Sequence, residues 1–97
     1  MKMFAVHYTY RADEAAARDE HRPAHRDWLR SLVEEDVVVS AGAFADGSGA
    51  LILLNATAIP SVEAAHKVLA DDPFAHAHLA HDVSVREWSP VMGELSS

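Results

Sequence analysis

His25 is the residue of this sequence best placed to move a proton. At helical spacing, Arg22 and His25 share one stripe with Leu29 and Leu32. The two leucines should face the protein core, so the imidazole and the guanidinium should point towards it as well. An imidazole changes charge near neutral pH, which suits it to general acid–base catalysis. The alternative is a histidine that is only hydrogen-bonded in the core, and Pro23 leaves the helical phase upstream of it open.

Two arginines could hold a negatively charged ligand. The planar fork of a guanidinium suits a carboxylate or a phenolate. Arg22 lies one helical turn before His25, and Arg86 lies on the last predicted strand. The alternative for each arginine is an ion pair with one of the fifteen acidic residues. Arg22 has the stronger case because its stripe points inwards.

A second set of polar side chains lies on the predicted strands. Alternation along the first, second and last strands would place His7, Ser40, Ser84 and Arg86 on one face of a sheet. A few such groups in an apolar wall are typical of a small-molecule site. The alternative is that these positions lie at an edge or face solvent.

The histidine-rich segment around His78 resembles a metal-binding tract, but its spacing does not suit one. His78 and His81 could share a helical face, whereas His76 and His78 share a face only in an extended chain. No single geometry presents all three histidines, and no carboxylate pattern completes a known site, so we expect no bound metal. His78 could instead lie at the rim of a pocket.

Other catalytic motifs do not occur in the sequence. No nucleophile elbow surrounds Ser40, and neither a phosphate-binding loop nor a dinucleotide fingerprint is found. Any chemistry would therefore use side chains alone, and we expect no cofactor.

Composition narrows the class of protein. The chain has 97 residues, which suits a single domain over residues 1–97, and it has no cysteine for a disulfide or a thiolate zinc site. Its net charge of −7 would repel the phosphate backbone of nucleic acids. No secretory signal is visible, and no apolar stretch approaches the roughly 20 residues that span a bilayer. We expect a cytoplasmic protein that binds neither nucleic acids nor membranes.

Periodicity and turn residues predict the elements that must position these side chains. Strands are expected over residues 3–10, 37–41, 50–56 and 82–88. Helical patterns run over 15–20 and 24–35, with Asp13 as a candidate cap. Pro23 should mark either a kink or the start of a second helix, leaving Arg22 distorted. The apolar stripe of the longer pattern ends at Val33.

Two further helices are expected after the third strand. Ser61 should cap one of them, and Asp72 followed by Pro73 should open a short one, with an irregular tail from about residue 89. The order βαββαβ is the ferredoxin-like arrangement of an α+β fold, with helices on one face of an antiparallel sheet. A second copy of the chain is the simplest cover for the other face, and two such sheets would form the dimeric α+β barrel of a homodimer.

A series of motifs resembles the YCII-related family from about residue 2 to about residue 88. The motifs are Arg22-Pro23-Ala24-His25, Trp28-Leu29, Ser40-Ala41-Gly42-Ala43-Phe44, Asp46-Gly47-Ser48-Gly49-Ala50 and Asp71-Asp72-Pro73-Phe74. The resemblance implies a dimeric α+β barrel. Two positions depart from the family's pattern, because His78 stands where glycine is frequent and Ala43 stands where proline is usual. A substrate therefore cannot be carried over from the family.

The resemblance also implies a site. The family's candidate histidine and aspartate fall on His25 and Asp72, and activities in and near the family are eliminations and isomerisations of small cyclic or chlorinated compounds. A carboxylate that hydrogen-bonds an imidazole would fix its tautomer and support its basicity. Asp72 before Pro73 could also be only a helix cap, with Asp71 as an alternative partner for the histidine.

Two interpretations of function follow. In the first, the protein is a cofactor-independent enzyme, in which His25 transfers a proton, Asp72 orients His25 and Arg22 holds the negative charge of a small cyclic or chlorinated substrate. In the second, the domain binds a small molecule or a partner without chemistry, since a fold does not fix a function. A haem-degrading or oxygen-using monooxygenase of the same barrel type is a third interpretation, and the sequence offers no sign of its cofactor.

Overall fold

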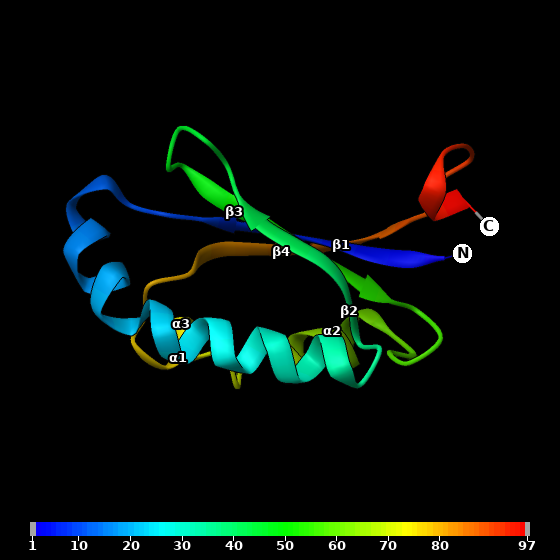
Figure 1. Ribbon diagram of the computed structural model, residues 1–97, viewed down its shortest axis with the longest axis horizontal. Coiled ribbons are helices and arrows are strands. Elements are labelled where there is room, and N and C mark those ends of the chain that lie inside the picture. The colour runs from blue at the N-terminus through cyan, green and yellow to red at the C-terminus, as the bar shows by residue number, and fades with distance from the viewer. Residues whose placement is uncertain (1, 97) are drawn as a thin grey trace.

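Four antiparallel strands form the sheet in this computed structural model, which describes residues 2–96. The strands are β1 (Met3–Thr9), β2 (Val38–Ala43), β3 (Gly49–Asn55) and β4 (His81–Trp88). They lie side by side in the order β2-β3-β1-β4 (Figure 1). All four predicted strands are present, and their ends differ from the expected ends by at most two residues.

The three α-helices lie on one face of this sheet, as predicted (Figure 1). They are α1 (Ala15–Glu34), α2 (Val62–Leu69) and α3 (Pro73–His76), and short 3₁₀ turns occur at η1 (Ala12–Glu14) and η2 (Glu94–Ser96). With α3 as a small addition, the order βαββαβ is the ferredoxin-like α+β arrangement. Among residues 2–96, no helix combines the length and the apolar composition needed to cross a bilayer.

Of the two alternatives predicted at Pro23, the kink occurs and no second helix starts. Helix α1 continues through Pro23, and Arg22 is helical. Proline lacks the amide hydrogen that would bond one turn back, and its ring crowds the carbonyl of Asp19. Figure 1 shows the axis of α1 changing direction between its blue first turns and the cyan remainder, so the helix bends here without breaking.

Two of the three predicted helix caps are present. The hydroxyl of Ser61 accepts a hydrogen bond from the backbone N–H of Ala64, which confirms the predicted start of α2. Asp72 caps α3 in the same way, with Pro73 in the first turn. The prediction for Asp13 is wrong, because it lies in η1 and the first residue of α1 has no side-chain cap.

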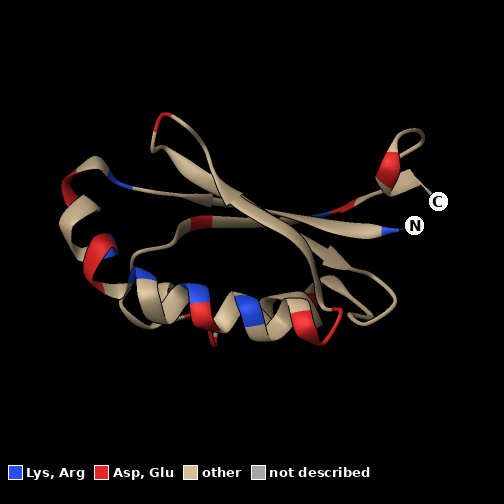
Figure 2. Ribbon diagram, viewed as in Figure 1, with Lys and Arg blue, Asp and Glu red and all other residues tan. Residues whose placement is uncertain are grey.

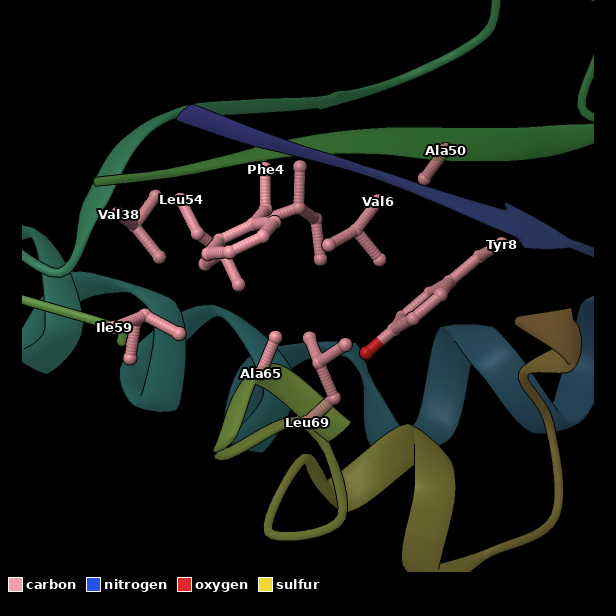
Figure 3. Close-up of a cluster of buried hydrophobic side chains, with 10 residues drawn as sticks. Phe4, Val6, Tyr8, Val38, Ala50, Leu54, Ile59, Ala65 and Leu69 are labelled. Atoms are coloured by element: carbon pink, nitrogen blue, oxygen red, sulfur yellow. The ribbon is translucent and has the colours of Figure 1, made fainter. Parts of the chain in front are cut away.

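The hydrophobic core lies between the sheet and the helices (Figure 3). Alternation along β1 sends Phe4, Val6 and Tyr8 towards the helices, and each of these side chains is at most 2% exposed. Ala65 and Leu69 of α2 pack against them. The full list of buried residues in this cluster is Phe4, Val6, Tyr8, Val38, Ala50, Ile52, Leu54, Ile59, Ala65 and Leu69.

The opposite face of the sheet is left open by the helices. The strand register places Ala5 beside Arg86, His7 beside Ser84, and Leu53 beside Ser40. The prediction that the four polar residues share one face is therefore confirmed, and the face they share is the one turned away from α1. The large apolar side chains of Phe44, Leu51 and Trp88 are exposed. The helices thus cover only one face of β3, and on its other face Leu51 is exposed while Leu53 is 8% exposed.

Val33 does not belong to the buried stripe of α1. Its side chain is 49% exposed, whereas Leu29 and Leu32 pack against the core as expected. The buried stripe of α1 is therefore shorter than the apolar pattern indicated.

The close approach of two strands at Gly49 gives a test of the fold. A Cβ atom at Gly49 would overlap the backbone carbonyl oxygen of Tyr8, which cannot move without disturbing β1. We predict that Gly49→Ala lowers the free energy of unfolding by roughly 1–3 kcal/mol, measured by urea denaturation. Gly42→Ala is the matched control on β2, where a Cβ meets nothing within 4 Å, and it should change stability by no more than about 0.5 kcal/mol. Equal stability of the two variants would contradict the register.

Candidate active site

His25 and Asp72 meet in the interior of the chain. Helix α1 turns His25 towards the sheet, leaving it 8% exposed, and Asp72 precedes α3 with no exposed surface at all. The imidazole Nδ1 lies 2.7 Å from Oδ1 of Asp72. The predicted contact between these two residues is therefore present. Asp72 is both a helix cap and the partner of the histidine, so the two alternatives for this residue are true together.

Three donors surround the Asp72 carboxylate. Its Oδ1 accepts from the backbone N–H of Phe74 at 2.9 Å as well as from His25, and its Oδ2 accepts from the hydroxyl of Tyr8 at 2.8 Å. A buried carboxylate needs such partners, and an ionised one only accepts. The proton of the neutral imidazole must therefore be on Nδ1, which leaves the lone pair on Nε2.

The second imidazole nitrogen remains accessible. Within residues 2–96, Nε2 of His25 makes no hydrogen bond, and no buried polar side-chain atom lacks a partner, so Nε2 must be reached by solvent. The Phe74 ring stacks on the imidazole at 3.9 Å with an angle of 2° between the planes, and Trp28 lies on α1 one turn further along. These contacts hold the ring plane while Nε2 stays open to a ligand.

A cavity of about 360 Å³ adjoins His25 on the helix side of the sheet. Leu29, Ile52 and Phe74 give it apolar walls, and small residues of β2 and β3 such as Ala41 and Ala50 leave the space open. A mostly apolar hollow with a few polar groups is typical of a site for a small molecule. Its size suits a single ring better than an extended chain.

Two arginines are among the residues that line the same cavity. They are Arg22, a candidate from the sequence, and Arg26, one turn further along α1. Arg22 also donates to Asp19, whose carboxylate is largely exposed, so this surface ion pair is weak and a bound anion could replace it. Figure 2 shows basic and acidic residues interspersed along α1. In a chain of net charge −7, two arginines beside one cavity favour a negatively charged ligand.

Burial and the Asp72 charge both act on the tyrosines of the site. Burial raises the pKa of Tyr8 far above its ordinary value, and the neighbouring Asp72 carboxylate raises it further. Burial likewise raises the pKa of Tyr10, and Asp72 adds to the effect, while the positive charges of Arg18 and Arg22 oppose it. The guanidinium of Arg18 lies 4.6 Å from the centre of the Tyr10 ring. Both phenols are therefore neutral donors at physiological pH.

The remaining predicted site residues lie elsewhere. His7, Ser40 and Arg86 are on the open face of the sheet, so the structure does not bring them to His25 within the chain. The His7 ring packs against Phe44 on that face, with the ring centres 5.4 Å apart. The reason is the strand alternation, which sends Phe4, Val6 and Tyr8 to the helix side and their neighbours to the other.

His78 also lies away from the imidazole of His25. It borders a separate cavity of about 250 Å³, together with Tyr8, His66 and His81. His81 is held by Glu14 at 2.6 Å between Nε2 and Oε1. Within residues 2–96, no three side chains of the kinds that bind metals are placed to share an ion.

Sequence reasoning missed Tyr8, Arg26 and the role of the Phe74 ring. Tyr8 had a detectable signal, because it and Tyr10 have polar tips on the otherwise apolar face of the predicted first strand. Arg26 follows Arg22 by four residues, which is the spacing that puts two side chains on one face of a helix. Phe74 could not be found from local pattern, because its stacking partner lies in another helix.

The chain belongs to the YCII-related domain family, whose model matches residues 2–89. Among solved structures, it is similar to 5-chloro-2-hydroxyhydroquinone dehydrochlorinase from Burkholderia phenoliruptrix in complex with 2,5-dihydroxybenzoquinone. The two proteins share 21% sequence identity with a TM-score of 0.76, over 90% of this chain and 93% of the other.

A second solved structure, Rv0793 from Mycobacterium tuberculosis, is similar at 16% identity with a TM-score of 0.54. The match covers 96% of this chain and 97% of the other. At these identities both likenesses establish the fold. No curated protein matches the chain.

The raised pKa values of the tyrosines predict how the protein responds to alkali. The chain has only two tyrosines, so tyrosinate absorbance should not rise in the folded protein until the pH is above the ordinary value of about 10. The folded state holds both protons more tightly than the unfolded chain. Stability should therefore be unaffected by these groups below about pH 10 and should fall as the pH rises above it. A tyrosine that titrates at or below pH 10 without unfolding would contradict the burial of this site.

Proposed function

We propose that this protein is a cofactor-independent acid–base enzyme that acts on a small, anionic, cyclic substrate. The observation that carries the proposal is the buried hydrogen bond between His25 and Asp72 beside a cavity of suitable size. In this proposal Asp72 orients the imidazole, and Nε2, which makes no hydrogen bond within residues 2–96, is the base that meets the substrate in that cavity. Elimination, including loss of hydrogen chloride, and isomerisation both need only a positioned base and acid.

The elimination can be written with this chain's own residues. The reacting form is the keto tautomer of the substrate, in which the carbon that bears chlorine is saturated. Nε2 of His25 takes a proton from this tautomer, the electron pair left behind forms a new double bond in the ring, and the carbon–chlorine bond breaks as chloride leaves. The products are the unsaturated ring, chloride and a proton on the imidazole, so no outside oxidant is needed. The Asp72 carboxylate stabilises the imidazolium until the proton passes to water. Isomerisation would use the same base, with the proton returned to a different atom.

The walls of the cavity select the substrate class. Arg22 and Arg26 hold a phenolate or carboxylate oxygen, and Leu29, Ile52 and Phe74 contact the flat faces of a ring. The ligand named for the similar dehydrochlorinase, 2,5-dihydroxybenzoquinone, is a flat oxygenated ring of this kind. That similarity supports the proposed class of reaction, and the side chains of this cavity support the proposed class of substrate.

The homodimer is part of the proposal. The open face of the sheet carries exposed Phe44, Leu51 and Trp88, which is a concentration of large apolar groups that a lone domain would leave in water. A second copy placed face to face would cover it and complete the dimeric α+β barrel. His7 and Arg86 would then lie in the interface, and the two cavities beside His25 would stay on the outer, helix-covered sides.

Substitution of the pair tests the enzymatic proposal. Chloride release from 5-chloro-2-hydroxyhydroquinone and related chlorinated phenols is the assay. His25→Ala should lower kcat by roughly 10²–10⁴-fold, because it removes the base. Asp72→Asn should cost less, since the amide oxygen still accepts from Phe74 but no charge supports the imidazolium. His76→Ala, an exposed histidine in α3, is the matched control and should keep full activity.

The alternative, a binding domain without chemistry, gives a different pattern. His25→Ala would then change ligand affinity or stability, and no substrate in the panel would be turned over by the unaltered protein. Turnover that survives His25→Ala unchanged would also contradict the proposal.

A substitution that places a charged side chain on the open face of the sheet tests the homodimer. We expect a dimer at micromolar concentration in sedimentation equilibrium, and Leu51→Asp should shift it to monomer, because a buried unpaired carboxylate is strongly unfavourable in an interface. Val33→Asp is the matched control, an exposed apolar residue on the helix side that should leave the dimer intact. A monomeric parent protein, or dissociation by Val33→Asp alone, would refute this arrangement.

A further inference from the structure

Tyr8 contacts Asp72 from the side opposite His25. Its hydroxyl donates to Oδ2 at 2.8 Å, whereas His25 and the Phe74 amide both bond to Oδ1. Tyr8 is 1% exposed and Asp72 is fully buried, so water does not compete for either oxygen. In Figure 3 the Tyr8 hydroxyl points from β1 towards the helices. A chain of hydrogen bonds thus runs from the sheet through the carboxylate to the imidazole.

The hydroxyl of Tyr8 has no packing role of its own. Phe4 and Val6 occupy the same face of β1 and fill the core without polar atoms. A phenylalanine at position 8 would fill almost the same space as tyrosine. A buried hydroxyl is unfavourable unless it finds an acceptor, so its presence here is explained by the carboxylate it reaches.

We propose that Tyr8 is a positioning residue that acts on His25 through Asp72. Rotation of the Asp72 carboxylate about its bond to the β-carbon would carry Oδ1 away from Nδ1, and the two donors on Oδ1 and the Tyr8 donor on Oδ2 all oppose that rotation. The Tyr8 hydroxyl fixes Oδ2, so Oδ1 stays directed at Nδ1 and the imidazole keeps the tautomer with Nε2 exposed. The proposal adds a supporting residue to the proposed function. Its effect on catalysis rests on that function, in which His25 is the base.

The hydroxyl can do this over a wide pH range. Burial and the nearby Asp72 charge raise the pKa of Tyr8, so the phenol keeps its proton at physiological pH. The groups that face this carboxylate are His25 from α1, Tyr8 from β1 and the Phe74 amide from α3, and Tyr10 lies close enough to sense its charge.

NMR of the unliganded protein tests the proposal without any substrate. In Tyr8→Phe, the Nδ1 proton of His25 should exchange with water about tenfold faster, because one hydrogen bond to a charged group is lost. The fraction of His25 in the other tautomer should rise, as read from the two ring ¹⁵N shifts. Tyr10→Phe is the matched control and should leave both signals unchanged, since Tyr10 donates no hydrogen bond to Asp72. Unchanged exchange and tautomer in a folded Tyr8→Phe variant would overturn the proposal.

A second substitution covers the case in which Tyr8→Phe does not fold. Incorporation of 3-fluorotyrosine at position 8 keeps the ring and makes the hydroxyl a stronger donor, so exchange of the His25 Nδ1 proton should become slower. No slowing in that protein would overturn the proposal as well.

Kinetics separate this inference from the proposed function. Tyr8→Phe should lower kcat about tenfold with little change in KM, because the proposed substrate contacts are made by residues that line the cavity beside His25, and Tyr8 is not one of them. A normal kcat with an altered NMR signature would overturn the claim that Tyr8 contributes to catalysis, while the claim that Tyr8 positions His25 would stand. Absence of turnover in the unaltered protein, with the predicted NMR change present, would count against the enzyme and not against the role of Tyr8.

Discussion

A carboxylate that is buried away from water must be hydrogen-bonded to donors. In this fold, the donors to Asp72 constrain how several elements are arranged. The donors come from three separate elements, with Tyr8 in β1, His25 in α1 and the Phe74 amide in α3. The sheet, the long helix and the short helix therefore meet at one charge. The same contacts decide which imidazole nitrogen is bonded to the carboxylate, so the stability of the interior and the proposed chemistry depend on one polar centre.

The strands and helices could be predicted because each follows a local rule. Two-residue alternation marks β1, and side-chain oxygens at Ser61 and Asp72 mark the starts of α2 and α3. At Pro23 the predicted kink occurs, whereas the alternative of a second helix starting there does not, because tertiary packing competes with local preference. His25 and Leu29 anchor α1 against the sheet after the proline, and that burial outweighs one lost backbone hydrogen bond, so the helix bends and continues.

The site was less predictable because its contacts join distant parts of the chain. Forty-seven residues separate His25 from Asp72, and only the family resemblance brought them together before the fold was known. Alternation correctly grouped His7 with Arg86 on one face, but that grouping alone does not say which face the helices cover. The apolar side chains at the alternate positions of β1 indicated that their face is the one covered by the helices. Tyr8 belongs to that set, and its polar hydroxyl was overlooked.

A crystal structure with 2,5-dihydroxybenzoquinone bound would test the assignment of this site most directly. We predict that the ring lies in the cavity beside Phe74, with one oxygen within hydrogen-bond distance of Nε2 of His25 and another near the guanidinium of Arg22 or Arg26. A ring bound instead on the open face of the sheet, or in the separate cavity beside His78, would contradict it.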